Sequence, residues 1–163
     1  MYMCTRQYTP ISVKEMEEKL KNCLKIYNEM YGSKISELKS LQKEAIVHLI
    51  TSTDDLICML PTGYGKSLIY ETIPVFCKHM LKQVAFVVII ELLNVIIQQQ
   101  VTKLGSSAIF LQQQMSATEF DSLKNCEVSY IFTHPEHILG KKDIYSILLP
   151  EVYESKKKLY SSG

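Results

Sequence analysis

The segment LPTGYGKS, residues 60–67, constrains this chain more than any other part of its sequence. It lies between a short apolar run, residues 56–60, and a stretch of helical periodicity that begins near Lys66. A turn in this position lets backbone N–H groups and the positive end of a helix dipole converge on one anion. Gly63 and Gly65 allow the backbone conformations that such a turn requires. The segment therefore predicts a phosphate-binding loop between a buried strand and a helix.

Strand and helix patterns alternate along most of the chain. Apolar runs predict strands at 56–60, 84–90, 108–111 and 128–132, and recurring apolar positions predict helices at 12–31, 41–52, 66–80 and 92–104. Ser12 with Glu15 predicts a capping box for the first helix, and Gly32 its end. Pro74 should kink or end the helix that follows the loop. The alternation predicts an α/β fold with a mostly parallel sheet covered by helices on both faces.

Lys66 and Ser67 are the predicted catalytic residues of the loop. Lys66 would neutralise the β- and γ-phosphates of a nucleotide, and the Ser67 hydroxyl would be a ligand of Mg²⁺. The strict GxxxxGK[ST] pattern requires glycine where Leu60 stands, whereas GxGKS after Pro-Thr is the form found in helicases. The expected cofactors are ATP and Mg²⁺. The expected cofactor-binding residues of the loop are Pro61, Thr62, Gly63, Tyr64, Gly65, Lys66 and Ser67.

From Tyr31 to Tyr153 the sequence resembles the first RecA-like motor lobe of the RecQ-like ATP-dependent DNA helicases. The resemblance implies a RecA-like P-loop three-layer sandwich, here an incomplete first helicase lobe. It implies an N-terminal helical extension at 1–32, a partial helicase ATP-binding domain at 33–153, and a disordered tail at 154–163. A complete member of that family would couple ATP hydrolysis to 3'–5' DNA unwinding, in DNA repair.

The residues just ahead of the loop look like the adenine-recognition motif of this family, in which a basic residue precedes a glutamine by three places. The resemblance implies that Lys39 packs on the adenine base and that Gln42 reads its edge. A side-chain amide can donate and accept hydrogen bonds at once, which discrimination between adenine and guanine requires.

Two downstream segments look like degenerate nucleic-acid motifs of the family. In residues 89–101, Glu91 stands where the family has serine, and a carboxylate there should repel a DNA phosphate. In residues 131–136, His134 replaces a hydroxyl residue, and its imidazole could donate one hydrogen bond to a phosphate. We therefore expect DNA binding to be weak or lost in this chain. The candidate DNA-contacting residues are Gln100, His134, Pro135 and Glu136.

Phosphoryl transfer by such a motor needs an Asp on a strand and an adjoining Glu that orients the attacking water. The 163-residue sequence contains no Asp-Glu dipeptide, and residues 143–153 resemble the segment that precedes the Asp-Glu-Ala-His motif of the family. We expect this chain alone to bind nucleotide without turnover. One alternative is a catalytically inactive module that binds nucleotide or a partner. A P-loop kinase or GTPase is disfavoured because no Asn-Lys-x-Asp string is present.

Charge and hydropathy set limits on the partners. The chain has 18 Lys+Arg and 17 Asp+Glu, a net charge of +1, so any contact with nucleic acid must be local. The apolar run at 84–90 is too short to cross a bilayer, and no membrane partner is expected. Five cysteines without a CxxC spacing disfavour a disulfide framework and a zinc site. The expected location is the nucleus or the cytoplasm.

Overall fold

A computed structural model describes residues 12–112, 114–125 and 127–139 of the chain. The described residues fall into two compact units, which meet in the sequence at Ala85 and Phe86. The predicted boundary between an extension and an ATP-binding domain at residues 32–33 stays a prediction. The predicted tail, 154–163, lies outside the described residues. The described part contains no helix with the length and apolar character needed to cross a membrane.

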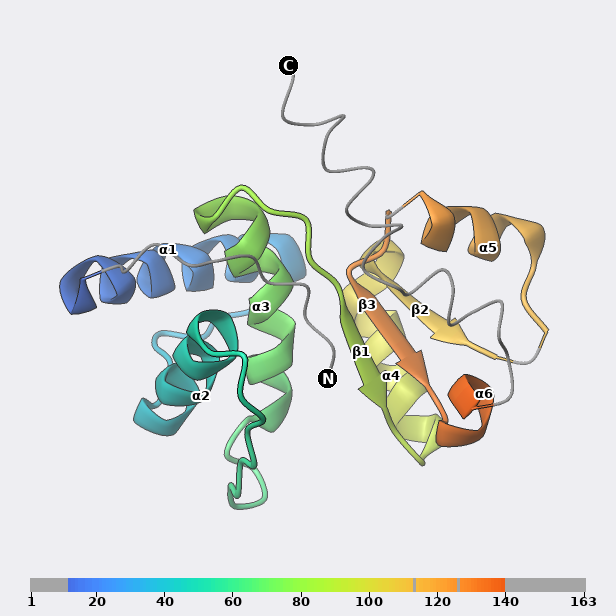
Figure 1. Ribbon diagram of the computed structural model, residues 1–163, viewed down its shortest axis with the longest axis horizontal. Coiled ribbons are helices and arrows are strands. Elements are labelled where there is room, and N and C mark those ends of the chain that lie inside the picture. The colour runs from blue at the N-terminus through green and yellow to red at the C-terminus, as the bar shows by residue number, and fades with distance from the viewer. Residues whose placement is uncertain (1–11, 113, 126, 140–163) are drawn as a thin grey trace. The chain divides into compact units, whose positions relative to one another are not determined.

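The first unit contains three helices (Figure 1): α1 (Val13–Tyr31), α2 (Ser40–Thr51) and α3 (Lys66–Met80). The predicted start of α1 is confirmed, since the Ser12 side chain accepts a hydrogen bond from the Glu15 backbone N–H at 3.3 Å. The Glu15 carboxylate pairs with Lys19 at 3.1 Å. Gly32 ends the helix with φ 61°, a left-handed conformation that glycine adopts without a steric penalty.

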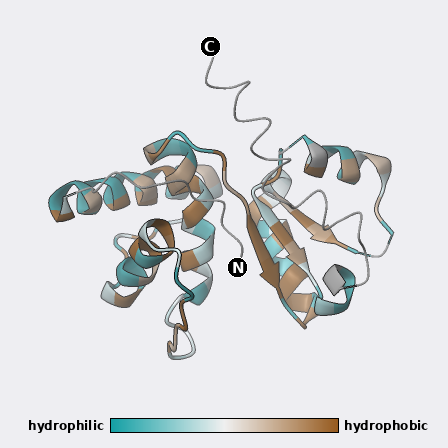
Figure 2. Ribbon diagram, in the orientation of Figure 1, coloured by the Kyte–Doolittle hydropathy of each residue, from teal (hydrophilic) through white to brown (hydrophobic). Residues whose placement is uncertain are grey.

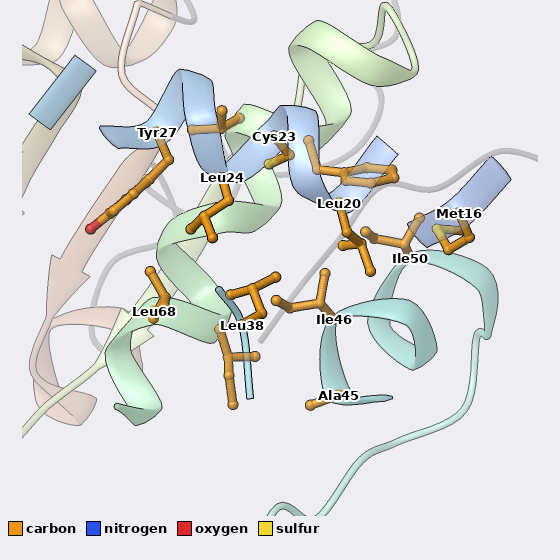
Figure 3. Packing of buried hydrophobic residues seen from close by; sticks show 13 residues of the cluster. Met16, Leu20, Cys23, Leu24, Tyr27, Leu38, Ala45, Ile46, Ile50 and Leu68 are labelled. Atoms are coloured by element: carbon orange, nitrogen blue, oxygen red, sulfur yellow. The ribbon is translucent and has the colours of Figure 1, made fainter. Parts of the chain in front are cut away.

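The core of this unit forms where α1 and α2 both pack against α3. Figure 3 shows apolar side chains of the three helices pointing toward one another. A polar contact crosses the same core, because the Tyr27 hydroxyl donates to the Glu71 carboxylate and neither side chain is exposed. Helix α3, which follows the predicted phosphate loop, is therefore held along its length by the other two. The central apolar residues are Leu20, Leu24, Tyr27, Leu38, Ile46, Ile50, Leu68, Ile69 and Phe76.

Pro74 does not end α3. The helix has the predicted bounds and continues through Pro74 to Met80. Residues 71–77 are all buried, so the packing of this helix against its neighbours outweighs the loss of one backbone hydrogen bond at proline. Of the two predicted effects of Pro74, the end of the helix is wrong, and a kink at this position stays a prediction.

The predicted strand at residues 56–60 is also wrong. These residues form no strand, and the side chains of Ile57 and Met59 are each 89% exposed. An apolar run becomes a buried strand only where neighbouring strands satisfy its backbone groups and cover both faces. No strand of the described chain pairs with this run, so it remains an irregular connection into the loop.

The second unit is built around a three-stranded parallel sheet in the order β1-β3-β2. In the register, Val87 and Ala108 both lie beside Tyr130, the first residue of the central strand. Figure 2 shows hydrophobic residues along the strands. The elements are β1 (Val87–Ile90), α4 (Asn94–Leu104), a 3-10 turn η1 (Gly105–Ser107), β2 (Ala108–Leu111), α5 (Ala117–Lys124), β3 (Tyr130–Thr133) and α6 (Pro135–Leu139).

This topology confirms the α/β class with a parallel sheet, and it is consistent with a partial RecA-like lobe. The strand predicted at 84–90 begins only at Val87, and the one predicted at 128–132 runs from Tyr130 to Thr133. Apolar residues of the strands, of α5 and of the segments just before β1 and β3 form the core of this unit, namely Phe86, Ile109, Leu111, Leu123, Val128 and Ile131.

Helices α5 and α6 were not among the predicted elements, although α5 carries a local signal. Ser116 and Glu119 form a capping box at its start, in which each side chain bonds the backbone N–H of the other residue. The S-x-x-E spacing at 116–119 is the pattern that predicts such a start.

Candidate functional site

The predicted phosphate loop forms a tight turn at the start of α3. The Tyr64 backbone N–H donates to the Pro61 carbonyl oxygen at 3.2 Å, which closes the turn. Gly63 and Gly65 have φ values of 77° and 92°, in the region where a side chain is strained. The two glycines thus perform the conformational role that the sequence predicts for them.

The loop ends at the amino end of α3, where backbone donors are available. Leu68 N–H bonds to the Gly65 carbonyl at 3.2 Å. In the described part of the chain, the N–H groups of Gly63, Gly65, Lys66 and Ser67 have no acceptor. The first N–H groups of a helix have no intrahelical partner, and they carry the positive end of its dipole. This cluster of donors fits an anion such as a phosphate.

Two side chains complete the amino end of α3. The Lys66 side chain is exposed, and the Ser67 side chain is half-buried. Among the described residues neither side chain has a hydrogen-bond or ion-pair partner. An ammonium and a hydroxyl in these positions fit a phosphate chain and its Mg²⁺ ion, as the sequence predicts.

Lys39 and Gln42, which are distant from the loop in sequence, contact it directly. Gln42 is 3% exposed, and its Nε2 donates to the carbonyl oxygens of Tyr64 and Gly65, both at 3.0 Å. Its Oε1 accepts from the Lys39 backbone N–H at 2.9 Å, which caps the start of α2. The structure thus brings the predicted adenine-recognition pair together with the predicted phosphate loop.

The Lys39 side chain also lies against Tyr64. Its Nζ donates to the Tyr64 carbonyl at 3.3 Å and lies 4.5 Å from the centroid of the Tyr64 ring, a cation–π contact. Tyr64 is therefore held through both its carbonyl oxygen and its ring. Sequence reasoning assigned Lys39 and Gln42 to the base of a nucleotide and did not anticipate that they contact the loop.

A second polar cluster lies in the second unit, at the carboxyl ends of β1 and β3. His134 is 8% exposed, and its Nδ1 donates to the Glu91 carbonyl oxygen at 2.7 Å. Its Nε2 lies 2.8 Å from the Asn94 Oδ1 atom. The Glu91 carboxylate accepts from the backbone N–H groups of Leu92 and Leu93, at 2.8 and 3.1 Å. Both ring nitrogens of His134 therefore contact protein atoms within this unit.

The other predicted DNA-contacting residues belong to the same unit. Gln100 lies on α4, and its Oε1 atom is buried without a hydrogen-bond partner in the described structure. Pro135 begins α6, and Glu136 is exposed in its first turn. Asn94, which sequence reasoning missed, lies three residues after Glu91 and contacts His134. Only the fold could reveal this contact, since it joins positions 40 residues apart.

Residues 39–151 match the DEAD/DEAH box helicase family. The match covers more than half of the chain, and it includes Lys39, Gln42, the loop at 61–67, Glu91 and His134. The chain therefore belongs to the DEAD/DEAH box helicase family, and the matched segment is a helicase motor domain. Proteins of this family use ATP, normally with Mg²⁺, and bind nucleic acid. A comparison with curated proteins finds no match.

Proposed function

We propose that this chain binds ATP and Mg²⁺ through the loop at 61–67, as part of the first motor lobe of a RecQ-like DNA helicase. The observation that carries the proposal is the cluster of unbonded N–H groups at Gly63, Gly65, Lys66 and Ser67 in the described structure. These donors lie at the amino end of α3, the positive end of its dipole, where a triphosphate would be stabilised.

Each side chain of the loop has a specific role in this proposal. Lys66 neutralises charge on the β- and γ-phosphates, and the Ser67 hydroxyl is a ligand of Mg²⁺. Bound Mg²⁺ supplies charge neutralisation on the phosphate oxygens. Pro61, Thr62 and Tyr64 shape the turn, and Lys39 packs against the base. The amide of Gln42, which lies beside the loop, reads the adenine edge.

Nucleic-acid binding is a family property, and we propose DNA as the partner of the complete motor. The DNA-contacting residues in this proposal are Gln100, His134, Pro135 and Glu136. The Glu91 carboxylate bonds to the backbone of Leu92 and Leu93, and the His134 ring to the backbone of Glu91, which supports weak DNA binding by this chain, since these groups already have partners. A role in DNA repair, movement in the 3'–5' direction, and a location in the nucleus or cytoplasm belong to the same proposal.

A second candidate function is binding of nucleotide without turnover. It is favoured by the absence of an Asp-Glu dipeptide from the 163 residues, because the family reaction uses a carboxylate pair to hold Mg²⁺ and orient water. The carboxylate of Glu91, at the position of a phosphate-binding hydroxyl in the resembled family, favours it further.

Titration of the 163-residue chain with ATP and Mg²⁺, with and without single-stranded DNA, tests both candidates. We expect saturable ATP binding and no phosphate release that DNA stimulates. DNA-stimulated phosphate release would contradict the absence of turnover, and failure to bind ATP would contradict the proposed function altogether.

A further inference from the structure

The contacts of Gln42 suggest a role that is independent of the nucleotide base. A primary amide has two N–H donors, and both donors of Gln42 are used by the carbonyl oxygens of Tyr64 and Gly65, each at 3.0 Å. The side chain is buried, and its Oε1 atom is bonded to Lys39. The amide is therefore bonded through its oxygen to the start of α2 and through its nitrogen to the loop.

These two bonds determine where the loop N–H groups point. In a planar trans peptide, the carbonyl oxygen and the N–H of the next residue point in opposite directions. When Gln42 holds the carbonyl oxygens of Tyr64 and Gly65, the N–H groups of Gly65 and Lys66 must point away from α2. These two N–H groups are among the donors without an acceptor in the described chain.

Gly65 has a second requirement besides its positive φ. A Cβ atom at this position would lie 2.7 Å from the Gln42 Nε2 atom, closer than real Cβ contacts allow. The absence of a side chain at Gly65 thus lets the amide approach the backbone. Gly63, by contrast, has nothing within 4 Å of its would-be Cβ. The two glycines of the loop therefore differ, and only Gly65 is matched to Gln42.

We propose that Gln42 is a positioning residue that directs the N–H groups of Gly65 and Lys66 toward a bound phosphate, whatever base the nucleotide carries. This inference rests on the proposed function, because it concerns the same loop. The positioning role and recognition of adenine predict different results. A residue that only recognises adenine affects the affinity only of nucleotides that contain adenine. Loss of the amide should weaken even a phosphate chain with no base.

The decisive variant is Gln42→Met, which keeps the length of the side chain and its lack of charge but removes both donors, together with the Oε1 acceptor that caps α2. The matched control is Gln83→Met, the same change at a half-buried residue of the same unit. The affinities of inorganic triphosphate, ATP and GTP, each with Mg²⁺, are measured by calorimetry. We expect Gln42→Met to weaken all three by about tenfold, and Gln83→Met to change none.

Amide hydrogen exchange of the nucleotide-free protein gives a second measurement, which does not depend on nucleotide binding. We expect the N–H groups of Tyr64 and Leu68, which bond to the loop carbonyl oxygens of Pro61 and Gly65, to exchange faster in Gln42→Met than in the unsubstituted chain, with the exchange of α1 unchanged. Weakened ATP binding with unchanged triphosphate binding and unchanged exchange would overturn the inference and leave Gln42 as a base reader. If the unsubstituted chain binds no triphosphate, the proposed function fails. Unchanged hydrogen exchange in Gln42→Met would separately refute the positioning role of Gln42.

A double-mutant cycle tests whether Gln42 and Gly65 act as a unit. Gly65→Ala should weaken triphosphate binding in the unsubstituted chain through both its φ and its contact with the amide. In the Gln42→Ala background the contact is absent, so Gly65→Ala should cost less. Equal costs in the two backgrounds would contradict the proposed match between the two residues.

Discussion

Gln42 Nε2 donates to the Tyr64 carbonyl oxygen at 3.0 Å, and this bond joins the start of α2 to the phosphate loop across 22 positions of sequence. Lys39, one turn away, contacts the same carbonyl and the Tyr64 ring. The loop is therefore held from outside before any ligand is bound. A loop held in this way loses less conformational freedom when a phosphate binds, which favours binding.

Replacement of Lys66 tests the loop as a phosphate site. Lys66→Ala removes the positive charge nearest the expected β- and γ-phosphates, and we expect the affinity for ATP to fall by about 100-fold. Lys78→Ala, which removes an exposed lysine from the last turn of the same helix, is the control and should bind ATP normally. Calorimetric titration measures both. Unchanged affinity in Lys66→Ala would remove the central support for the proposed function.

The buried thiol of Cys23 predicts a dependence of stability on pH. Burial, with a smaller effect of the Cys77 thiol, raises the pKa of Cys23 from 9.0 to about 12. Between these values the unfolded chain loses the thiol proton while the native chain keeps it. The free energy of unfolding should therefore fall as pH rises from 9, by up to about 1.4 kcal/mol per pH unit from this group.

Denaturant titrations at several pH values between 8 and 10 measure that slope. We expect Cys23→Ala to have a shallower slope than the unsubstituted chain. Cys58→Ala, which replaces an exposed cysteine of the same unit, should leave the slope unchanged. Equal slopes for all three proteins would show that Cys23 is not buried in the native state.

The hydroxyl of Tyr27 should contribute to the stability of the first unit. It donates to the carboxylate of Glu71 where both side chains are fully buried, so Tyr27→Phe deprives a buried carboxylate of this donor. We expect a loss of about 1–3 kcal/mol in the free energy of unfolding, measured in urea. Tyr64→Phe removes the hydroxyl of a half-buried tyrosine and should cost less than about 0.5 kcal/mol. Similar losses in the two variants would count against the buried pair.

The capping box of α5 predicts an effect in the second unit. Hydrogen bonds from the Ser116 backbone N–H, and to a smaller extent from its hydroxyl, lower the pKa of Glu119. Ser116→Ala removes the hydroxyl, so we expect a loss of about 1 kcal/mol in stability and a rise in the pKa of Glu119. Denaturation and an NMR titration of the carboxylate measure the two effects. Ser106→Ala, at an exposed serine of η1, is the control, and a pKa that does not move in Ser116→Ala would exclude the hydroxyl contact.

Elements whose signals are local could be predicted well. The start of α1 at Ser12 and its end at Gly32 depend on hydrogen bonds and backbone angles within a few residues. The helix at 66–80 has the predicted bounds because its backbone hydrogen bonds are also local. The strand at 108–111 agrees with the structure because its apolar run does find a partner strand, β3. The failures concern residues whose state depends on distant neighbours, such as the apolar run 56–60 and Pro74.

In the candidate site, too, the residues whose role depends on their sequence neighbours could be predicted, and those that depend on distant contacts could not. Lys66, Ser67 and the two glycines could be assigned from residue types and spacing, because a phosphate loop is made of consecutive residues. The hydrogen-bond partners of the Gln42 and His134 side chains could not, since these bonds join residues at least 22 positions apart, except for the cap at Lys39.

The amino-acid sequence alone determined the position of the proposed phosphate loop, its glycines and its charged and hydroxyl side chains, because these follow from the order of neighbouring residues. Only the tertiary structure decided that Gln42 holds the loop, that His134 is engaged by its own unit, and that residues 56–60 form no strand. The physical reason is that buried hydrogen bonds and strand pairs form between segments that packing brings together, and their spacing in sequence does not specify that packing.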